Sequence, residues 1–231
     1  MTALQKIVIG IISSLLATLI VILFQSRKQR LKPRLIFSMM VEVLFRSGVY
    51  FYPNRKKLMR DLGTVEQFVS TAKQSLIYVG FWLASLENTN LSREIKKLAL
   101  RDVTFEAYVL NPNSPLVDQL SQYFRLTPDQ VKHRILYASQ RISELKSELP
   151  NDKSNNIRLY YHESPITSSI FIFDRSLDSS KMMVDHKLFS TPRSDSYGIV
   201  LTKAKTQLYE SIFSTYGYII QSSSEVTTNH T

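Results

Sequence analysis

The stretch IRLYYHESPITSSIFIFDRS (residues 157–176) contains two short apolar runs joined by a turn. Both runs, 157–161 and 169–173, are rich in isoleucine, tyrosine and phenylalanine, which favour strands. His162 follows the first run and Asp174 follows the second. The stretch therefore predicts two strands with titratable residues at their ends, and such residues can serve an active site.

Strand and helix patterns alternate along the chain before this stretch, and strands cluster after it. The predicted strands are 49–52, 75–83, 104–110, 157–161, 169–173, 181–184 and 197–201. Helices are predicted to begin at Thr64, Ser92, Pro115, Thr127 and Ala204, and a polar loop is predicted at 151–156. This order indicates a chain of the α/β class, with one mixed α/β sandwich-like domain over residues 35–221 and a disordered tail at 222–231.

The helix after Thr127 has the most regular apolar pattern of the domain. Its apolar residues recur at intervals of four and three: Val131, Ile135, Ala138, Ile142, Leu145 and Leu149. Such a stripe is typical of a helix that lies on its own sheet, and it also fits a short coiled-coil seam. The first interpretation is the favoured one.

The N-terminus contains an uncharged apolar segment, IVIGIISSLLATLIVILF (residues 7–24), of 18 residues. As a helix it would be about 27 Å long, close to the thickness of the hydrocarbon core of a bilayer. A cleaved signal peptide would have a shorter apolar run that ends in a small-residue site. Because this run ends in Leu23 and Phe24, we predict a transmembrane anchor over residues 1–26.

A basic juxtamembrane segment, residues 27–34, follows the anchor. Its basic residues are Arg27, Lys28, Arg30, Lys32 and Arg34. The positive-inside rule then places the domain in the cytoplasm at the plasma (inner) membrane, with a short N-terminus outside. The cluster either contacts anionic membrane lipids or only sets the topology.

The composition excludes several classes of site. The chain has no cysteine, which excludes disulfides, thiolate metal sites and cysteine nucleophiles. Residues 1–34 contain six basic and no acidic side chains, so the rest of the chain has 23 basic and 19 acidic residues, a balance of only +4. The net charge of +10 therefore does not indicate a nucleic-acid-binding domain. We find no DNA-binding motif, phosphate-binding glycine loop or metal-ligand spacing, and predict no cofactor and no metal.

The order of elements around the opening stretch resembles one half of a phospholipase D-like fold. The signature of that family is H-x-K-x4-D, and the chain has T-x-S-x4-D in register, from Thr167 through Ser169 to Asp174. In the family the histidine attacks a phosphodiester and the lysine binds the phosphate oxygens. A threonine hydroxyl without a base is a poor nucleophile, and serine has no charge to offer the phosphate. The resemblance therefore implies a pseudo-enzyme without catalytic residues.

The resemblance also implies partners. Active members of the family with a single motif pair into dimers, so a homodimer or higher homo-oligomer is expected. Small anchored proteins of this plan also occur among bacterial anti-phage effectors, which act on the membrane. This second expectation is an analogy between folds.

Two other groups of residues are candidates for a site. His162 and Glu163 form a potential acid–base pair, although neighbours on a strand point to opposite faces. Trp82 and the nearby aromatic residues, with His162, Arg158 or Arg175, would form a cleft that stacks a nucleotide base. Most such aromatic residues are simply part of a core.

Three functions follow as hypotheses. The first is a membrane-anchored, non-catalytic sensor or effector that responds to a protein or nucleotide ligand. The second is a membrane-bound phosphodiesterase or nuclease with an unrecognised site around His162 and Asp174. The third is a membrane scaffold for a protein partner.

Overall fold

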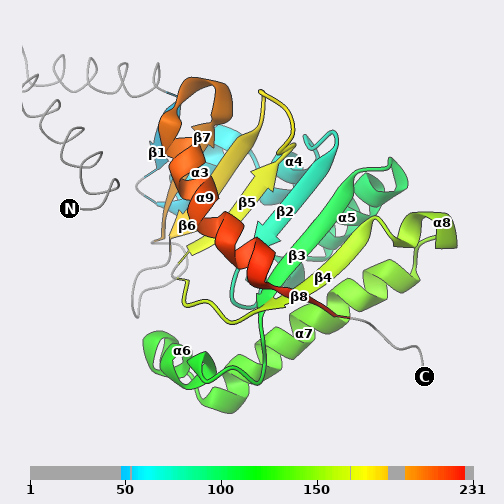
Figure 1. The fold of residues 1–231 in the computed structure, drawn as a ribbon, viewed down its shortest axis with the longest axis vertical. Coiled ribbons are helices and arrows are strands. Elements are labelled where there is room, and N and C mark those ends of the chain that lie inside the picture. Colours follow the sequence, from blue (N-terminus) through cyan, green and yellow to red (C-terminus); the bar gives the residue numbers. More distant parts are fainter. Residues whose placement is uncertain (1–47, 53, 167, 187–195, 227–231) are drawn as a thin grey trace, which may run out of the picture. The chain divides into compact units, whose positions relative to one another are not determined.

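The computed structural model describes residues 48–52, 54–166, 168–186 and 196–226, and the chain from Tyr50 onward forms one compact unit. Within these residues a single eight-stranded sheet, in the order β1-β7-β6-β5-β2-β3-β4-β8, has helices on both faces (Figure 1). The prediction of one mixed α/β domain is confirmed.

Every strand predicted from the sequence is present. The strands are β1 (Val49–Tyr52), β2 (Ser75–Val79), β3 (Thr104–Leu110), β4 (Ile157–His162), β5 (Ser168–Phe173), β6 (Lys181–His186), β7 (Tyr197–Thr202) and β8 (Ser224–Glu225). β2, β3 and β4 are parallel, whereas β5 is antiparallel to β2, β6 to β5 and β7 to β6. The prediction for β2 was too long, because the chain leaves the sheet after Val79 and Leu83 takes a left-handed conformation with φ of 46°.

The helices of the domain are α3 (Arg55–Leu62), α4 (Val65–Val69), α5 (Thr89–Leu100), α6 (Leu116–Phe124), α7 (Pro128–Ser147), α8 (Asn151–Ser154) and α9 (Gln207–Ser222). Short 3₁₀ turns occur at Ala84–Glu87 and Lys203–Lys205. The capping boxes predicted at Thr64 and Thr127 are confirmed. The start predicted for α5 was wrong: the side chain of Asn88 accepts from the N–H of Asn90, and Ser92 is buried inside the helix. Asparagine is a strong N-cap, and it begins the helix earlier than the serine does.

One face of the sheet is covered by α9, and the other by α3, α4, α5 and α7 (Figure 1). On the second face the rings of Tyr78 and Phe171, directly opposite each other on β2 and β5, stack 3.9 Å apart. The apolar stripe of α7 is fully buried against β3 and β4. The stripe is therefore the inner face of a helix on its own sheet, as the favoured interpretation predicted.

Two tyrosines, seven residues apart, fasten α9 to the sheet. The hydroxyl groups of Tyr209 and Ser180 lie 2.6 Å apart, and Ser180 also donates to the carbonyl of Phe173 at 2.7 Å. Nearer the other end of the helix, the Tyr216 hydroxyl bonds to Ser168 on β5. Residues seven apart lie on the same face of a helix, so both tyrosines reach the same surface of the sheet.

Two segments that the sequence predicted to be irregular are ordered. Residues 151–154 of the predicted loop form α8, one short helix after Pro150. In the predicted disordered tail, Ser224 and Glu225 pair with Tyr161 and Tyr160 as β8, because β4 leaves backbone groups open at the sheet edge. Residues 227–231 lie outside the described part.

No helix in the described residues is long and apolar enough to cross a membrane. The predicted anchor at 7–24 lies outside those residues. The same holds for the basic cluster: Arg27, Lys28, Arg30, Lys32 and Arg34. The membrane span therefore stays a prediction.

Candidate functional site at one end of the sheet

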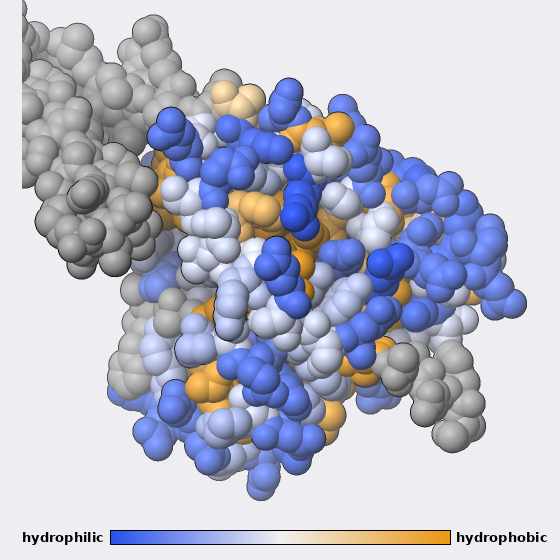
Figure 2. Space-filling view, in the orientation of Figure 1, coloured by the Kyte–Doolittle hydropathy of each residue, from blue (hydrophilic) through white to orange (hydrophobic). Residues whose placement is uncertain are grey.

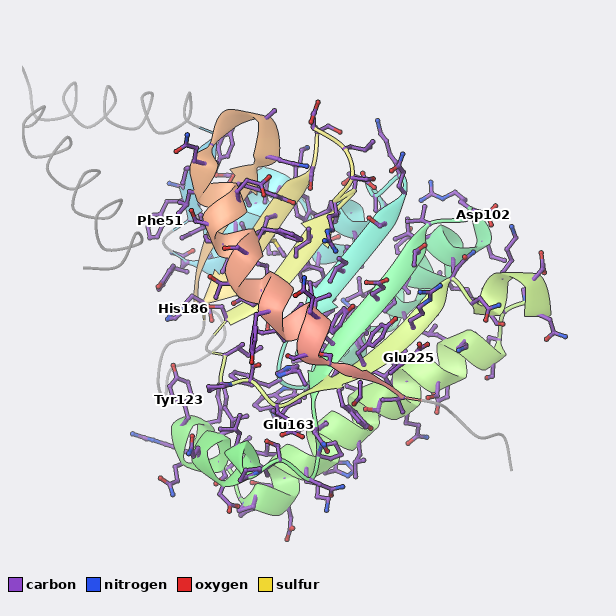
Figure 3. The ribbon with its side chains drawn as sticks, viewed as in Figure 1. Phe51, Asp102, Tyr123, Glu163, His186 and Glu225 are labelled. Carbon is purple, nitrogen blue, oxygen red and sulfur yellow. The ribbon has the colours of Figure 1, made fainter. Side chains whose placement is uncertain are left out.

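The strand directions bring the carboxyl ends of β2, β3, β4 and β6 to the same end of the sheet as the amino ends of β5 and β7. This end, which we call the motif end, contains Gly80, Asn111, His162, Glu163, Ser168, Ser169, Asp185 and His186. Figure 3 shows Glu163 and His186 at this end, whereas Asp102 lies at the opposite end. Thr167 falls outside the described residues.

Asp174 lies at the other end of β5 from Ser169. They are five positions apart along an extended strand, a distance of about 17 Å. One carboxylate oxygen of Asp174 accepts from the backbone N–H groups of Lys73, Gln74 and Ser75, at 2.8, 2.7 and 3.2 Å. Asp174 is buried, has a φ of 51°, and closes the turn into β2. The predicted motif therefore does not gather in one pocket, and its aspartate has a structural role.

Ser169, which is in register with the lysine of the family motif, is buried at the motif end. Its direct partner on β6 is Asp185. Gly80, at the end of β2, passes close by: a Cβ atom at Gly80 would lie 3.0 Å from the Ser169 hydroxyl. The backbone of β2 therefore fits around a small side chain at position 169.

Asp185 is held by a cation from a distant part of the chain. The guanidinium of Arg55, at the start of α3, bonds to Oδ2 of Asp185 at 2.5 Å. The Asp185 side chain is only 5% exposed and that of Arg55 16% exposed. The second oxygen, Oδ1, has no hydrogen-bond partner among the described residues. Because Asp185 neutralises the charge of Arg55, the guanidinium of Arg55 is a weak ligand for a phosphate.

The ring of His162 joins the end of β4 to the loop that follows it and to Gly80 at the end of β2. Its Nδ1 accepts from the N–H of Ser164 at 3.2 Å, so its Nε2 carries the proton and donates to the carbonyl of Gly80 at 3.3 Å. The residue is 1% exposed. Burial lowers the pKa of His162 to about 4, despite the opposing effect of the hydrogen bond to Gly80. Both ring nitrogens are occupied and the ring is neutral, so His162 is a structural residue and not a general base.

This histidine makes the free energy of unfolding depend on pH. The folded pKa of about 4 lies below the model value of 6.5, so the unfolded chain binds more protons between these pH values. Lowering the pH through this window should therefore destabilise the fold, by about 3 kcal/mol in total at 1.36 kcal/mol per pKa unit. Urea unfolding at several pH values measures the effect, and His162→Gln should remove most of the slope between pH 4 and 6.5. An unchanged slope in this variant would contradict the assignment.

The predicted acid–base pair of His162 and Glu163 is not formed. A carboxylate oxygen of Glu163 accepts from the side-chain amide of Asn111 at 2.7 Å, and the N–H of Asn111 donates to the carbonyl of His162 at 2.9 Å. These bonds join the end of β4 to the loop after β3. Glu163 thus stabilises this loop.

The predicted ligand cleft is not assembled either. Trp82 is buried at the motif end, where Phe124 packs against it and Arg134 lies 5.5 Å from the centre of its ring. Arg158 is near the start of β4, and Arg175 follows Asp174 just after β5. Both arginines therefore lie at the end of the sheet opposite the motif end. His162 and the two arginines therefore do not meet at one site.

Arg158 and Arg175 lie instead on the face that α9 covers. Arg175 lies 4.7 Å from the centre of the Phe213 ring. The pKa of Arg158 is raised mainly by its hydrogen bond to Tyr160, with contributions from Glu106 and Glu225. The two carboxylates offset the charge of the two arginines, so this surface gives little attraction to a nucleotide phosphate.

One pair of potentially reactive side chains was missed by the sequence analysis. Oγ of Ser168 lies 2.7 Å from Nδ1 of His186, its direct partner on β6. This is the spacing of a nucleophile and its base. Ser168 is 7% exposed and also bonds to Tyr216 of α9. The sequence could not reveal the pair, because it depends on the register between two strands.

A small apolar pocket of about 160 Å³ lies beside the motif end, between α6 and the loop before β5. It is lined by Phe81, Leu116, Gln119, Leu120, Tyr123, Pro165 and Ile166. Within the described part of the chain, no three histidine, aspartate or glutamate side chains are grouped so that they could hold a metal ion. The described motif end thus offers apolar surface, the ion pair of Arg55 and Asp185, and the Ser168–His186 pair.

No family model and no curated protein matches the chain in sequence. Among solved structures, Nuc, a phospholipase D family member from Salmonella typhimurium, is similar with a TM-score of 0.39 and 10% identity, over 78% of this chain and 98% of that one. Phosphatidylserine synthase from Haemophilus influenzae Rd KW20 has a TM-score of 0.45 and 12% identity, over 77% of this chain and 39% of that one. TrmBL2, an archaeal chromatin protein, has a TM-score of 0.43 and 10% identity, over 97% of this chain and 71% of that one. Likenesses of this strength do not assign the chain to a family.

Proposed function

We propose that the protein is a single-pass membrane protein whose phospholipase D-like domain binds a ligand or partner without cleaving a phosphodiester. The domain would lie on the cytoplasmic side of the inner membrane and act as a sensor or effector. The apolar segment at 7–24 and the basic residues after it support the anchor. The proposed homo-oligomer and the anti-phage role follow only from the resemblance.

One observation carries the non-catalytic part of the proposal. Position 169, where the family has its phosphate-binding lysine, is a buried serine that faces Asp185. Arg55 is already bound to this aspartate. A phosphate at this position would meet a neutral ion pair instead of an ammonium group, and would therefore gain no net charge attraction.

Ser168 and His186 support a second candidate, a hydrolase. In that case His186 would take the proton of Ser168 as the hydroxyl attacks an ester or phosphoester, and would give it to the leaving group. A water deprotonated by His186 would then cleave the serine adduct and restore the Ser168 hydroxyl. The burial of Ser168 and its bond to Tyr216 favour the non-catalytic candidate. In that case Ser168 and His186 hold α9 on the sheet.

A hydrolysis assay separates the two candidates. The full chain, purified in detergent, would be incubated with bis(4-nitrophenyl) phosphate, single-stranded DNA and phospholipid vesicles, beside the variants Ser168→Ala and Asp185→Asn. We expect no hydrolysis above that of the two variants. Turnover that Ser168→Ala abolishes would establish the hydrolase and defeat the non-catalytic proposal.

A further inference from the structure

The helix α3 carries exposed basic residues close to the point where the chain enters the described domain. Lys56, Lys57 and Arg60 are exposed, and only a few residues separate them from Gly48, the first residue that the structure describes. Of the eight residues of α3, four are basic and one is acidic. Arg55 and Arg60 are paired with Asp185 and Asp61, so the net basic charge of α3 comes from Lys56 and Lys57.

Lys56 and Lys57 differ from half of the lysines and arginines on the other helices of the domain. Among the described residues, these two lysines have no ion-pair partner. By contrast, acidic partners are found for several cations elsewhere: Lys96 with Glu148, Lys97 with Glu94, Arg141 with Glu144, and Lys153 with Asp102. The two α3 lysines are thus available for an external anion.

Helix stability does not explain these lysines. They occupy the first turn of α3, which has no acidic residue. The amino end of a helix carries a partial positive charge, so basic side chains there are slightly destabilising. A negatively charged surface outside the domain would offset this effect.

An exposed aromatic ring lies on the edge strand β1, on the face of the sheet that α9 covers and not on the face of α3. Phe51, on the edge strand β1, is 56% exposed, and its ring is 5.7 Å from that of Tyr197. Figure 3 shows Phe51 at the outer edge of the domain, away from Glu225 and Asp102. Because α3 lies on the other face, this ring is not part of the surface that α3 presents.

Other parts of the described surface fit a bilayer less well. On the face that α9 covers, hydrophobic residues are visible only as small separate areas among hydrophilic ones (Figure 2). Tyr218 on α9 is 71% exposed, but α9 has no basic residue in its last turn. The first turn of α3, by contrast, carries two exposed lysines.

The length of the chain limits how far this surface can be from a membrane. Thirteen residues separate Arg34, the last residue of the basic juxtamembrane segment, from Gly48. Even fully extended they span at most about 50 Å. If residues 7–24 span the bilayer, α3 lies within reach of its surface.

We propose that Lys56, Lys57 and Arg60, the α3 surface, contact the anionic headgroups of the membrane in which the chain is anchored. This inference rests on the proposed membrane anchor. The contact orients the domain, because it brings the β1 edge of the sheet to the bilayer and leaves the β4 edge in solution.

The absence of cysteine allows a direct test. A single fluorescent label is attached to Asp61→Cys on α3, or to Asp152→Cys on α8 near the opposite edge of the sheet. The labelled full chain is reconstituted in vesicles of phosphatidylcholine, or in vesicles of which about one-third is phosphatidylglycerol, with nitroxide headgroup lipids as quenchers. We expect stronger quenching at position 61 than at 152, most of all in the anionic vesicles.

A charge reversal tests the residues themselves. Lys56→Glu with Lys57→Glu should lower the ratio of contacting to free domain at least about 25-fold, since each lysine near an anionic surface contributes about fivefold. Glutamate in the first turn stabilises a helix, so the variant should keep its fold. The matched control, Lys132→Glu with Lys146→Glu on α7, makes the same change in net charge and should leave the quenching unchanged.

Three outcomes would overturn the inference. The first is equal quenching at positions 61 and 152, and the second is an equal loss in both charge-reversal variants. The third is a DNA oligonucleotide that binds the vesicle-bound protein through Lys56 and Lys57, since these residues would then serve nucleic acid. Failure of the anchor itself is a separate result: alkaline carbonate would extract the chain from the vesicles.

Discussion

Replacing Asp174 by alanine should lower the free energy of unfolding by about 4 kcal/mol, and the melting temperature by about 10 °C for a domain of this size. The substitution leaves the three backbone N–H groups that bond to this carboxylate without their acceptor. It also places alanine at a φ of 51°, which aspartate and asparagine tolerate better. Urea unfolding followed by circular dichroism measures the loss.

Asp174→Asn is the matched control for this prediction. Asparagine keeps an oxygen at the same place and tolerates the left-handed conformation, so it should cost only about 1–2 kcal/mol. If both variants unfold like the parent, Asp174 is not the structural cap described above. A loss of ligand binding without a loss of stability would instead return Asp174 to a functional site.

Breaking the ion pair of Arg55 and Asp185 should have an effect of similar size. Arg55→Met removes the partner of a carboxylate that is 5% exposed, and should destabilise the domain by about 4 kcal/mol. Asp185→Val should cost less, about 1–2 kcal/mol, because the arginine is partly exposed and can turn toward water.

The double variant tests whether the ion pair makes the fold more stable than two apolar side chains would. Arg55→Met with Asp185→Val replaces the pair by apolar groups and should unfold within about 1 kcal/mol of the parent protein. The cycle of denaturant midpoints then gives the coupling energy between the two residues. Additive losses in the double variant would show that the two side chains do not act as a pair.

The local elements of this fold were predictable because their signals are short. Thr64 and Thr127 are followed three residues later by Gln67 and Gln130, and each pair forms the capping box that starts its helix. The β-branched and aromatic runs likewise gave the strands. Element ends were less accurate where two capping residues compete, as Asn88 and Ser92 do at α5.

The roles of the site residues were not predictable, because they depend on contacts between distant parts of the chain. The backbone donors of Asp174 precede it by about a hundred residues, and Arg55 precedes Asp185 by 130. A motif aligned along one strand also says nothing about which of its residues share an end of the sheet. For this reason Ser169 and Asp174 matched a single motif in sequence although a whole strand separates them.

The short strand β8 limits how two copies of the protein could associate. It pairs with Tyr160 and Tyr161, and the N–H of Val226 donates to the carbonyl of Leu159. The C-terminal segment therefore occupies much of the backbone that β4 would otherwise offer to a neighbouring chain. Two copies could pair β4 directly with β4 only by first displacing this segment, so a dimer that keeps β8 in place does not form through that pairing.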